Sequence, residues 1–129
     1  MAYTLQTFKA TLHIEINQAA QDAIIAGFDS SALGAPYRYE SDQFDQLNLI
    51  GAAQLGIGIT YRCVRLADGV EDYFAHTNAQ LQQVLADGAT RKLSLLQQAK
   101  AGRDSVDAAA DETAARVAAD AAIAAIGAL

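Results

Sequence analysis

The chain has 129 residues, of which nine are Lys or Arg and fifteen are Asp or Glu, so its net charge is −6. This balance argues against nucleic-acid binding as the main activity, because that affinity comes largely from basic side chains that neutralise phosphates. The length fits one compact core, and no apolar run approaches the roughly 18 to 20 residues of a membrane span. The first residues carry no secretion signal, so we expect synthesis in the cytoplasm.

The first predicted element is a helix over residues 4–26. Apolar side chains recur there at steps of three and four, which is the pattern of one helix face. We expect the helix to stop at Ala26, because Gly27 can adopt the left-handed conformation that closes a helix and Phe28 can fold back onto it. The residues of the predicted inner face are Leu5, Phe8, Leu12, Ile16, Ala19 and Ala23.

Two turns, a short strand and a second helix are predicted next. Asp29, Ser30 and Ser31 favour the first turn, and Gly34 with Pro36 favours the second. Residues 37–39 read as a strand. Ser41 or Asp42 can cap the following helix, which ends near Gly56 and Gly58. Its predicted inner face consists of Phe44, Leu47, Gly51 and Leu55.

A β-hairpin is predicted after the second helix. Residues 60–66 are rich in strand-forming side chains, and Asp68-Gly69 is a strong signal for a two-residue turn. That turn would place Arg65 opposite Asp72 and Cys63 opposite Phe74. Together with residues 37–39, the hairpin predicts a three-stranded antiparallel sheet.

The remainder of the chain is predicted to be helical. Thr77 and Gln80 form a capping-box pattern, and Asp87-Gly88 predicts either a kink or a break between two short helices. Alanine dominates residues 99–129, so helix propensity is high there, although alanine buries little apolar area. We expect an α+β fold, with residues 1–98 as a compact domain and 99–129 as an Ala-rich helix. That helix would pack on its own domain or on a partner chain, and the sequence leaves both open.

The polar residues offer few candidates for chemistry. His13 and His76 lack metal-ligand spacing, and structural roles account for them better, at a helix surface and at a strand-to-helix junction. Glu40, Asp42 and Asp45 lack the glycine-centred loop of a calcium site, and helix capping explains two of them.

The remaining candidate nucleophiles and carboxylates also lack a catalytic pattern. Ser30 and Ser31 lack a nucleophile elbow. Glu71 and Asp72 are adjacent on a strand and point to opposite faces, so they are expected to be solvated or paired with Arg65. Cys63, the only cysteine, reads as a buried strand residue. We therefore predict no catalytic, cofactor-binding or metal-binding residues, and no cofactor.

An ordered set of residues resembles a known family. The run IAGFDSSALGAPYRYESDQFDQLNL, the Asp-Gly hairpin and the segment HTNAQLQQVLADG are similar to small domains of unknown function encoded in tail-fibre regions of tailed bacteriophages and prophages. The resemblance covers about residues 15–100. The matching residues are Gly27, Phe28, Ser31, Ala32, Leu33, Gly34, Tyr39, Ser41, Asp45, Gln46, Asn48, Leu49, Gly69, His76, Thr77, Gln80, Leu81, Val84, Asp87 and Gly88.

This resemblance implies a structural virion protein of the phage tail, associated with the tail fibre or baseplate and mediating assembly or attachment. Its partners would be other tail proteins and copies of itself, with a trimer formed through the terminal helices as the first expectation. A fibre-assembly chaperone that leaves before the virion is complete is the alternative. An enzyme using two carboxylates is the third class, but no carboxylate pair stands out. Receptor recognition at a fibre tip would need exposed aromatic side chains, for which Tyr3, Tyr37 and Tyr39 are candidates.

Overall fold

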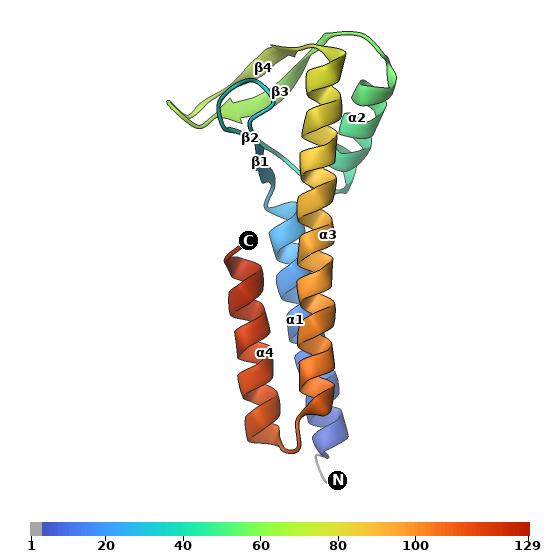
Figure 1. Ribbon diagram of the computed structural model, residues 1–129, viewed down its shortest axis with the longest axis vertical. Coiled ribbons are helices and arrows are strands. Elements are labelled where there is room, and N and C mark those ends of the chain that lie inside the picture. Colours follow the sequence, from blue (N-terminus) through green and yellow to red (C-terminus); the bar gives the residue numbers. More distant parts are fainter. Residues whose placement is uncertain (1–3) are drawn as a thin grey trace. The chain divides into compact units, whose positions relative to one another are not determined.

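The structure is a computed structural model that describes residues 4–129. It contains four helices and four strands, so the α+β expectation is confirmed (Figure 1). The chain forms two compact units. The helical unit contains the described residues up to Ala23 and Leu93–Leu129, and the sheet unit contains Ile24–Lys92. The elements are α1 (Leu5–Ile25), β1 (Phe28–Ser30), β2 (Tyr37–Tyr39), α2 (Gln43–Gln54), β3 (Ile59–Arg65), β4 (Val70–His76), α3 (Asn78–Ala108) and α4 (Glu112–Gly127).

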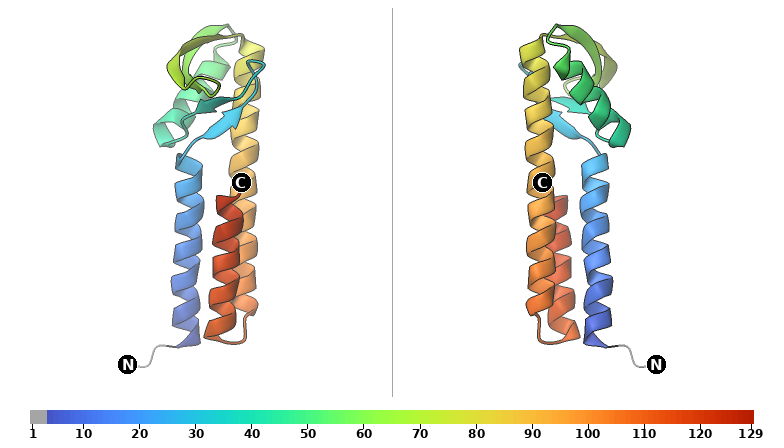
Figure 2. Two further views of the ribbon diagram at one scale, coloured as in Figure 1. Left: turned by 90° about the vertical axis from the view of Figure 1, so that its left-hand side faces the viewer. Right: turned by 90° about the vertical axis from the view of Figure 1, so that its right-hand side faces the viewer.

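The helical unit is formed by α1, the second half of α3 and α4, which lie side by side with α1 and α4 antiparallel to α3 (Figure 2). Leu12, Ile16 and Val106 are fully buried in it. A side-chain carbon at Gly102 would overlap the Cβ of Ala122 and lie 3.5 Å from Ile16. The small residues of α3 and α4 therefore allow the helices to approach closely.

The Ala-rich segment is divided between two helices rather than forming one. The expected division after residue 98 falls inside α3, and α4 begins after Asp111, whose carboxylate accepts a hydrogen bond from the Ala114 amide at 2.8 Å. Ala115, Ala119 and Ile126 of α4 are buried within the chain. Of the two packing arrangements that the sequence leaves open, packing on the chain itself is the one observed.

Helix α1 ends where its sequence predicts. Its last residue is Ile25, and Gly27 has a φ of +98°. A side chain at Gly27 would also come within 2.6 Å of the Tyr39 carbonyl oxygen, so both backbone conformation and space require glycine. The buried face continues from Leu12 and Ile16 at steps of four through Ala20 and Ile24, rather than through Ala19 and Ala23.

Polar contacts link the three helices of the helical unit. Arg103 donates to Asn17 at 2.6 Å, and Arg116 pairs with Glu15. His13 lies 2.8 Å from an oxygen of Asp107 through its Nε2. His13 therefore has the hydrogen-bonded surface role that its sequence context predicts.

The sheet has four antiparallel strands in the order β1-β2-β3-β4, and the prediction of three strands was wrong. The additional strand is β1, in which Phe28 pairs with Tyr39 and Ser30 with Tyr37. Asp and Ser in this segment favour a turn, so only the pairing with β2 reveals the strand.

The β3–β4 hairpin exists, but its predicted turn and register were wrong. Arg65 pairs with Val70 and Cys63 with Asp72, so residues 66–69 all lie in the turn. The Asp68 carboxylate accepts hydrogen bonds from the Arg65 side chain at 2.8 Å and from the Val70 amide at 3.1 Å. These bonds stabilise the longer turn, and they give Arg65 a different carboxylate from the expected Asp72.

Helix α2 buries the face opposite to the predicted one. Its buried residues are Leu49, Ala52 and Ala53. Both faces carry apolar residues, so periodicity alone does not choose between them. The two alanines allow α2 to pack closely on the sheet unit. The predicted face is exposed instead, with Phe44 at 76%, Leu47 at 60% and Leu55 at 60%.

Helix α3 begins as predicted but is not interrupted at Asp87-Gly88. Thr77 Oγ1 accepts from the Gln80 amide at 3.1 Å, and Gln80 Oε1 accepts from the Thr77 amide at 2.8 Å. The helix then continues unbroken to Ala108. A Cβ at Gly88 would lie 2.7 Å from the Phe28 ring, so this glycine makes room for an aromatic ring rather than ending a helix.

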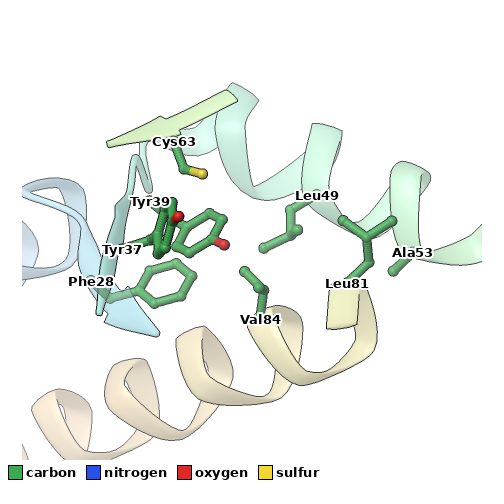
Figure 3. Close-up of a cluster of buried hydrophobic side chains, with 8 residues drawn as sticks. All are labelled: Phe28, Tyr37, Tyr39, Leu49, Ala53, Cys63, Leu81 and Val84. Atoms are coloured by element: carbon green, nitrogen blue, oxygen red, sulfur yellow. The ribbon is translucent and has the colours of Figure 1, made fainter. Parts of the chain in front are cut away.

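The core of the sheet unit lies where α2 and the first turns of α3 cover one face of the sheet (Figure 3). The Phe28 and Tyr39 rings stack with centroids 5.7 Å apart, and Ala32 and Leu33 pack against the cluster. Its side chains come from three strands and two helices: Phe28, Tyr37, Tyr39, Leu49, Ala53, Cys63, Leu81 and Val84.

Candidate functional site

A polar hollow of about 180 Å³ lies beside the N-terminus of α2. The first two turns of α2 position Asp45 and Asn48, while strands β3 and β4 position the aromatic and basic residues. Two tyrosines and an amide among charged side chains offer donors, acceptors and ring surface, which is the composition of a small polar binding site. Its lining residues are Glu40, Asp45, Asn48, Tyr61, Arg62 and Tyr73.

The positive charge of the polar hollow is already paired. Arg62 donates to Glu40 at 2.5 Å and lies 3.6 Å from Glu71. These two carboxylates, Glu40 above all, raise the pKa of Arg62. The guanidinium is therefore not a free anion-binding group.

The carboxylate of Asp45 belongs to the cap of α2. The Asp45 amide donates to Asp42 at 2.8 Å, and Asp45 accepts from the Asp42 amide at 3.2 Å. Burial raises the pKa of Asp45, and its backbone hydrogen bond with Asp42 opposes that shift. The predicted capping role of these two residues is thus confirmed, while Glu40 faces Arg62 instead. Among residues 4–129, no group of three or more His, Cys, Asp or Glu side chains could hold a metal ion.

A buried hydrogen-bonded pair joins β2 to the end of β4. The Tyr39 hydroxyl and the Nε2 of His76 are 2.7 Å apart, and the Nδ1 of His76 is 2.8 Å from the Phe74 carbonyl oxygen. Because a carbonyl only accepts, Nδ1 carries the proton and Nε2 accepts from Tyr39. Burial lowers the pKa of His76 and raises that of Tyr39. This pair holds the junction before α3 together, as predicted for His76, which is also one of the residues lining a shallow hollow at that junction.

Two of the three candidate nucleophiles, Ser30 and Cys63, also have structural roles. The Ser30 hydroxyl donates to Asp87 at 2.5 Å and accepts from the Ala32 amide at 3.3 Å. Cys63 is 2% exposed, and burial raises its thiol pKa, which disfavours the reactive thiolate. Neither side chain is activated.

The candidate aromatics for recognition are not the ones expected. Tyr37 and Tyr39 are buried, and Tyr3 lies outside the described residues. The exposed tyrosine is Tyr73, at 64%, in the wall of the polar hollow. Sequence reasoning missed it because the predicted register, which pairs Arg65 with Asp72, puts Tyr73 opposite Val64, whereas Tyr73 pairs with Arg62.

The most unusual surface is the exposed face of α2. We define the α2 stripe as Phe44, Leu47, Gly51 and Leu55, which recur at helical spacing. A side-chain carbon at Gly51 would meet nothing within 4 Å. An apolar helix face of this size on a protein surface is typical of an interaction site. The pattern is present in the sequence, where its periodicity predicts a buried face, but the structure exposes it.

The polar contacts described above have structural roles in the fold. They form the α2 cap, the ion pairs of Arg62 and the Tyr39–His76 junction. Besides the polar hollow, further hollows lie between α2 and α3, at the junction of β3, β4 and α3, and between α3 and α4. None of the helices in the described part of the chain combines the length and the apolar character needed to cross a bilayer.

Comparison with known proteins assigns a family but no activity. No curated protein and no solved structure shows significant similarity to the chain. A family model described as a domain of unknown function (DUF4376) matches residues 7–125 and so spans both units. The chain belongs to this family.

Proposed function

We propose that this protein is a structural component of a bacteriophage tail, associated with the tail fibre or baseplate, where it mediates assembly or attachment. The observation that carries the proposal is the ordered set of residues that resembles tail-fibre-region domains. In the structure several of these residues pack against or bond to one another in the sheet unit. Gly27 and Gly88 make room for neighbouring groups, Phe28 fills the core, and Tyr39 bonds to His76.

The surface of the sheet unit supports a role in assembly. The α2 stripe presents large apolar side chains to solvent, as expected of a subunit that docks on a neighbour. The two carboxylates of the polar hollow are held in structural contacts, Glu40 by Arg62 and Asp45 by the cap of α2. The partners would be other tail proteins and further copies of the chain, which would be made in the host cytoplasm and carried in the virion.

Mass spectrometry of purified virions tests this proposal. We expect the protein at a fixed stoichiometry relative to the tail proteins, and labelled antibodies should decorate the tail in electron micrographs. If particles purified through two density gradients lack the protein, the structural proposal is wrong.

A tail-fibre assembly chaperone is the alternative function. The exposed α2 stripe favours it as much as it favours a permanent subunit, because a chaperone also needs an apolar surface for its client. Co-expression separates the two. A chaperone should increase the yield of folded fibre and be absent from finished particles, whereas a structural subunit should remain in them.

A further inference from the structure

An apolar hollow of about 190 Å³, called the α2–α3 hollow below, lies between α2 and the first half of α3 (Figure 1). Its walls are formed by Leu49 and Ile50 of α2 and by Leu85 and Ala89 of α3. Ile50 and Ala89 are exposed, so the hollow opens to solvent. A cavity of about 150 Å³ is large enough to hold benzene, so the α2–α3 hollow has room for an apolar group of about six carbon atoms.

The rim of this hollow carries a positive charge. Lys92 is exposed and lines the hollow, and its Nζ donates to the side-chain oxygen of Gln46 at 2.9 Å. An amide oxygen is a neutral acceptor, so this bond leaves the charge of the ammonium unbalanced. In contrast, Arg38, Arg62 and Arg65 of the sheet unit each pair with a carboxylate.

The carboxylates nearest to the hollow along the chain are held by other groups. Asp42 accepts from the Asp45 amide at 2.8 Å in the cap of α2. Asp87 accepts from the Ser30 hydroxyl at 2.5 Å. Among residues 4–129, no carboxylate forms an ion pair with Lys92, so its ammonium remains available to an anion.

Ser41 adds a hydroxyl group to the charged end of the hollow. The residue is nine-tenths buried and lines the hollow. Its hydroxyl oxygen is not fully enclosed and has no hydrogen-bond partner in the described part of the chain, so it can donate to a ligand. The Gln46 side chain donates to the Ser41 carbonyl at 2.9 Å and accepts from Lys92. Ser41 and the ammonium of Lys92 therefore lie on either side of one amide group.

We propose that the α2–α3 hollow binds a small aliphatic carboxylic acid, with a chain of about six carbon atoms against Leu49 and Leu85 and its carboxylate between Lys92 and Ser41. A carboxylate only accepts hydrogen bonds, which suits an ammonium and a hydroxyl that both donate. Removing the chain from water supplies affinity, and the charge-assisted bond from Lys92 fixes the orientation. This ligand site goes beyond the proposed function and does not depend on it.

The polar groups of the hollow suffice for one carboxylate. The end of a polypeptide would also bring backbone amides, which need donors and acceptors of their own. The polar side chains of the lining are Ser41, Gln46 and Lys92, and the Gln46 amide is already bonded through both its oxygen and its nitrogen. A small free acid therefore fits the hollow better than a polypeptide terminus does. Because such a ligand buries little area, we expect a dissociation constant on the order of 1 mM.

A nuclear magnetic resonance titration of the full chain, with sodium hexanoate as the probe, tests the proposal. At constant ionic strength, hexanoate should shift the amide signals of residues 41–50 and 85–92 in a saturable way. Acetate has the head group without the chain, and 1-hexanol has the chain without the charge. Each of these two probes should bind at least tenfold more weakly than hexanoate.

Four variants assign the contacts. Lys92→Gln removes the charge, so it should weaken hexanoate binding at least tenfold and leave 1-hexanol binding unchanged. Lys100→Gln, at an α3 lysine that pairs with Asp104, is the matched control and should change neither. Ala89→Leu fills the hollow and should abolish the binding of both probes. Ala86→Leu, at an exposed position of the same helix outside the hollow, should leave both unchanged.

Several results would overturn the assignment. These are the absence of saturable shifts up to about 50 mM hexanoate, equal binding of hexanoate and 1-hexanol, or a Lys92→Gln variant that binds hexanoate as wild type does. If N-acetyl-leucine, which mimics a chain end, binds tenfold more tightly than hexanoate, the hollow receives a polypeptide terminus instead. Circular dichroism checks the fold of each variant, and the comparison of probes on the wild-type protein requires no variant. Virion analysis has no bearing on these outcomes, so the ligand site and the proposed function can fail separately.

Discussion

Replacing Gly88 by alanine tests whether this residue is a helix breaker or a packing residue. By sequence, Asp87-Gly88 predicts an interruption of the helix. In the structure α3 is continuous, and a Cβ at Gly88 would lie 2.7 and 2.9 Å from two atoms of the Phe28 ring. The two interpretations predict stability changes of opposite sign.

The expected magnitude follows from two opposing effects. Alanine in a helix interior is more favourable than glycine by about 1 kcal/mol. Against this, carbon atoms prefer separations of roughly 3.5 to 4.0 Å, and overfilling a core costs about 1 to 3 kcal/mol. Phe28 cannot easily move away, because it is 5% exposed and stacked on Tyr39. We expect the free energy of unfolding of Gly88→Ala to fall by about 1 kcal/mol, the balance of the two effects.

Urea denaturation followed by near-ultraviolet circular dichroism measures this change. The chain has no tryptophan and five tyrosines, most of which lie in the sheet unit, so the signal reports on the unit that contains Gly88. The tyrosines of that unit are Tyr37, Tyr39, Tyr61 and Tyr73.

Two controls isolate the steric effect. Gly51→Ala, at an open position of α2, should raise the free energy of unfolding by up to about 1 kcal/mol. Adding Phe28→Leu removes the ring from Gly88, so Gly88→Ala should no longer be destabilising in that background. If Gly88→Ala is as stable as wild type or more so, the close contact with Phe28 does not limit this position.

Three further predictions concern other parts of the fold. Asp42→Ala removes the α2 cap and should lower the free energy of unfolding by about 1 kcal/mol, measured by urea denaturation. Burial lowers the pKa of His76 in the folded protein, so below about pH 6.5 the unfolded chain binds more protons than the folded chain does. The free energy of unfolding should therefore decrease from pH 7 to pH 5. His76→Asn should flatten that slope, and an equally steep slope in the variant would contradict this assignment. Gly102→Val should lower the melting temperature by several degrees, because a side chain there overlaps Ala122, and Ala122→Gly should partly restore it.

Local signals near the ends of elements were predictable from the sequence. The first helix was predicted to stop at Ala26 and ends at Ile25, and the cap predicted at Ser41 or Asp42 is Asp42. The predicted Thr77–Gln80 box is observed. Each depends on backbone groups within about four residues, whose geometry is fixed by the helix itself.

The candidate site was only partly predictable. Asp42 and Asp45 could be assigned to a cap because both partners are close in sequence. Their place beside Tyr61 and Arg62 depends on how β3 lies against α2, which no local pattern encodes. Tyr73 was missed because a register shift of a few residues changes which side chains share a wall.

The sequence by itself determined that the chain is α+β, where α1 ends, and where α2 and α3 begin. Only the tertiary structure decided that β1 is a strand, that Gly88 lies against Phe28, and that α2 buries its alanines and exposes Phe44 and Leu47. The physical reason is that caps and turns are satisfied by near neighbours, whereas strand pairing and the choice of a buried face depend on the shape of surfaces brought together from distant parts of the chain.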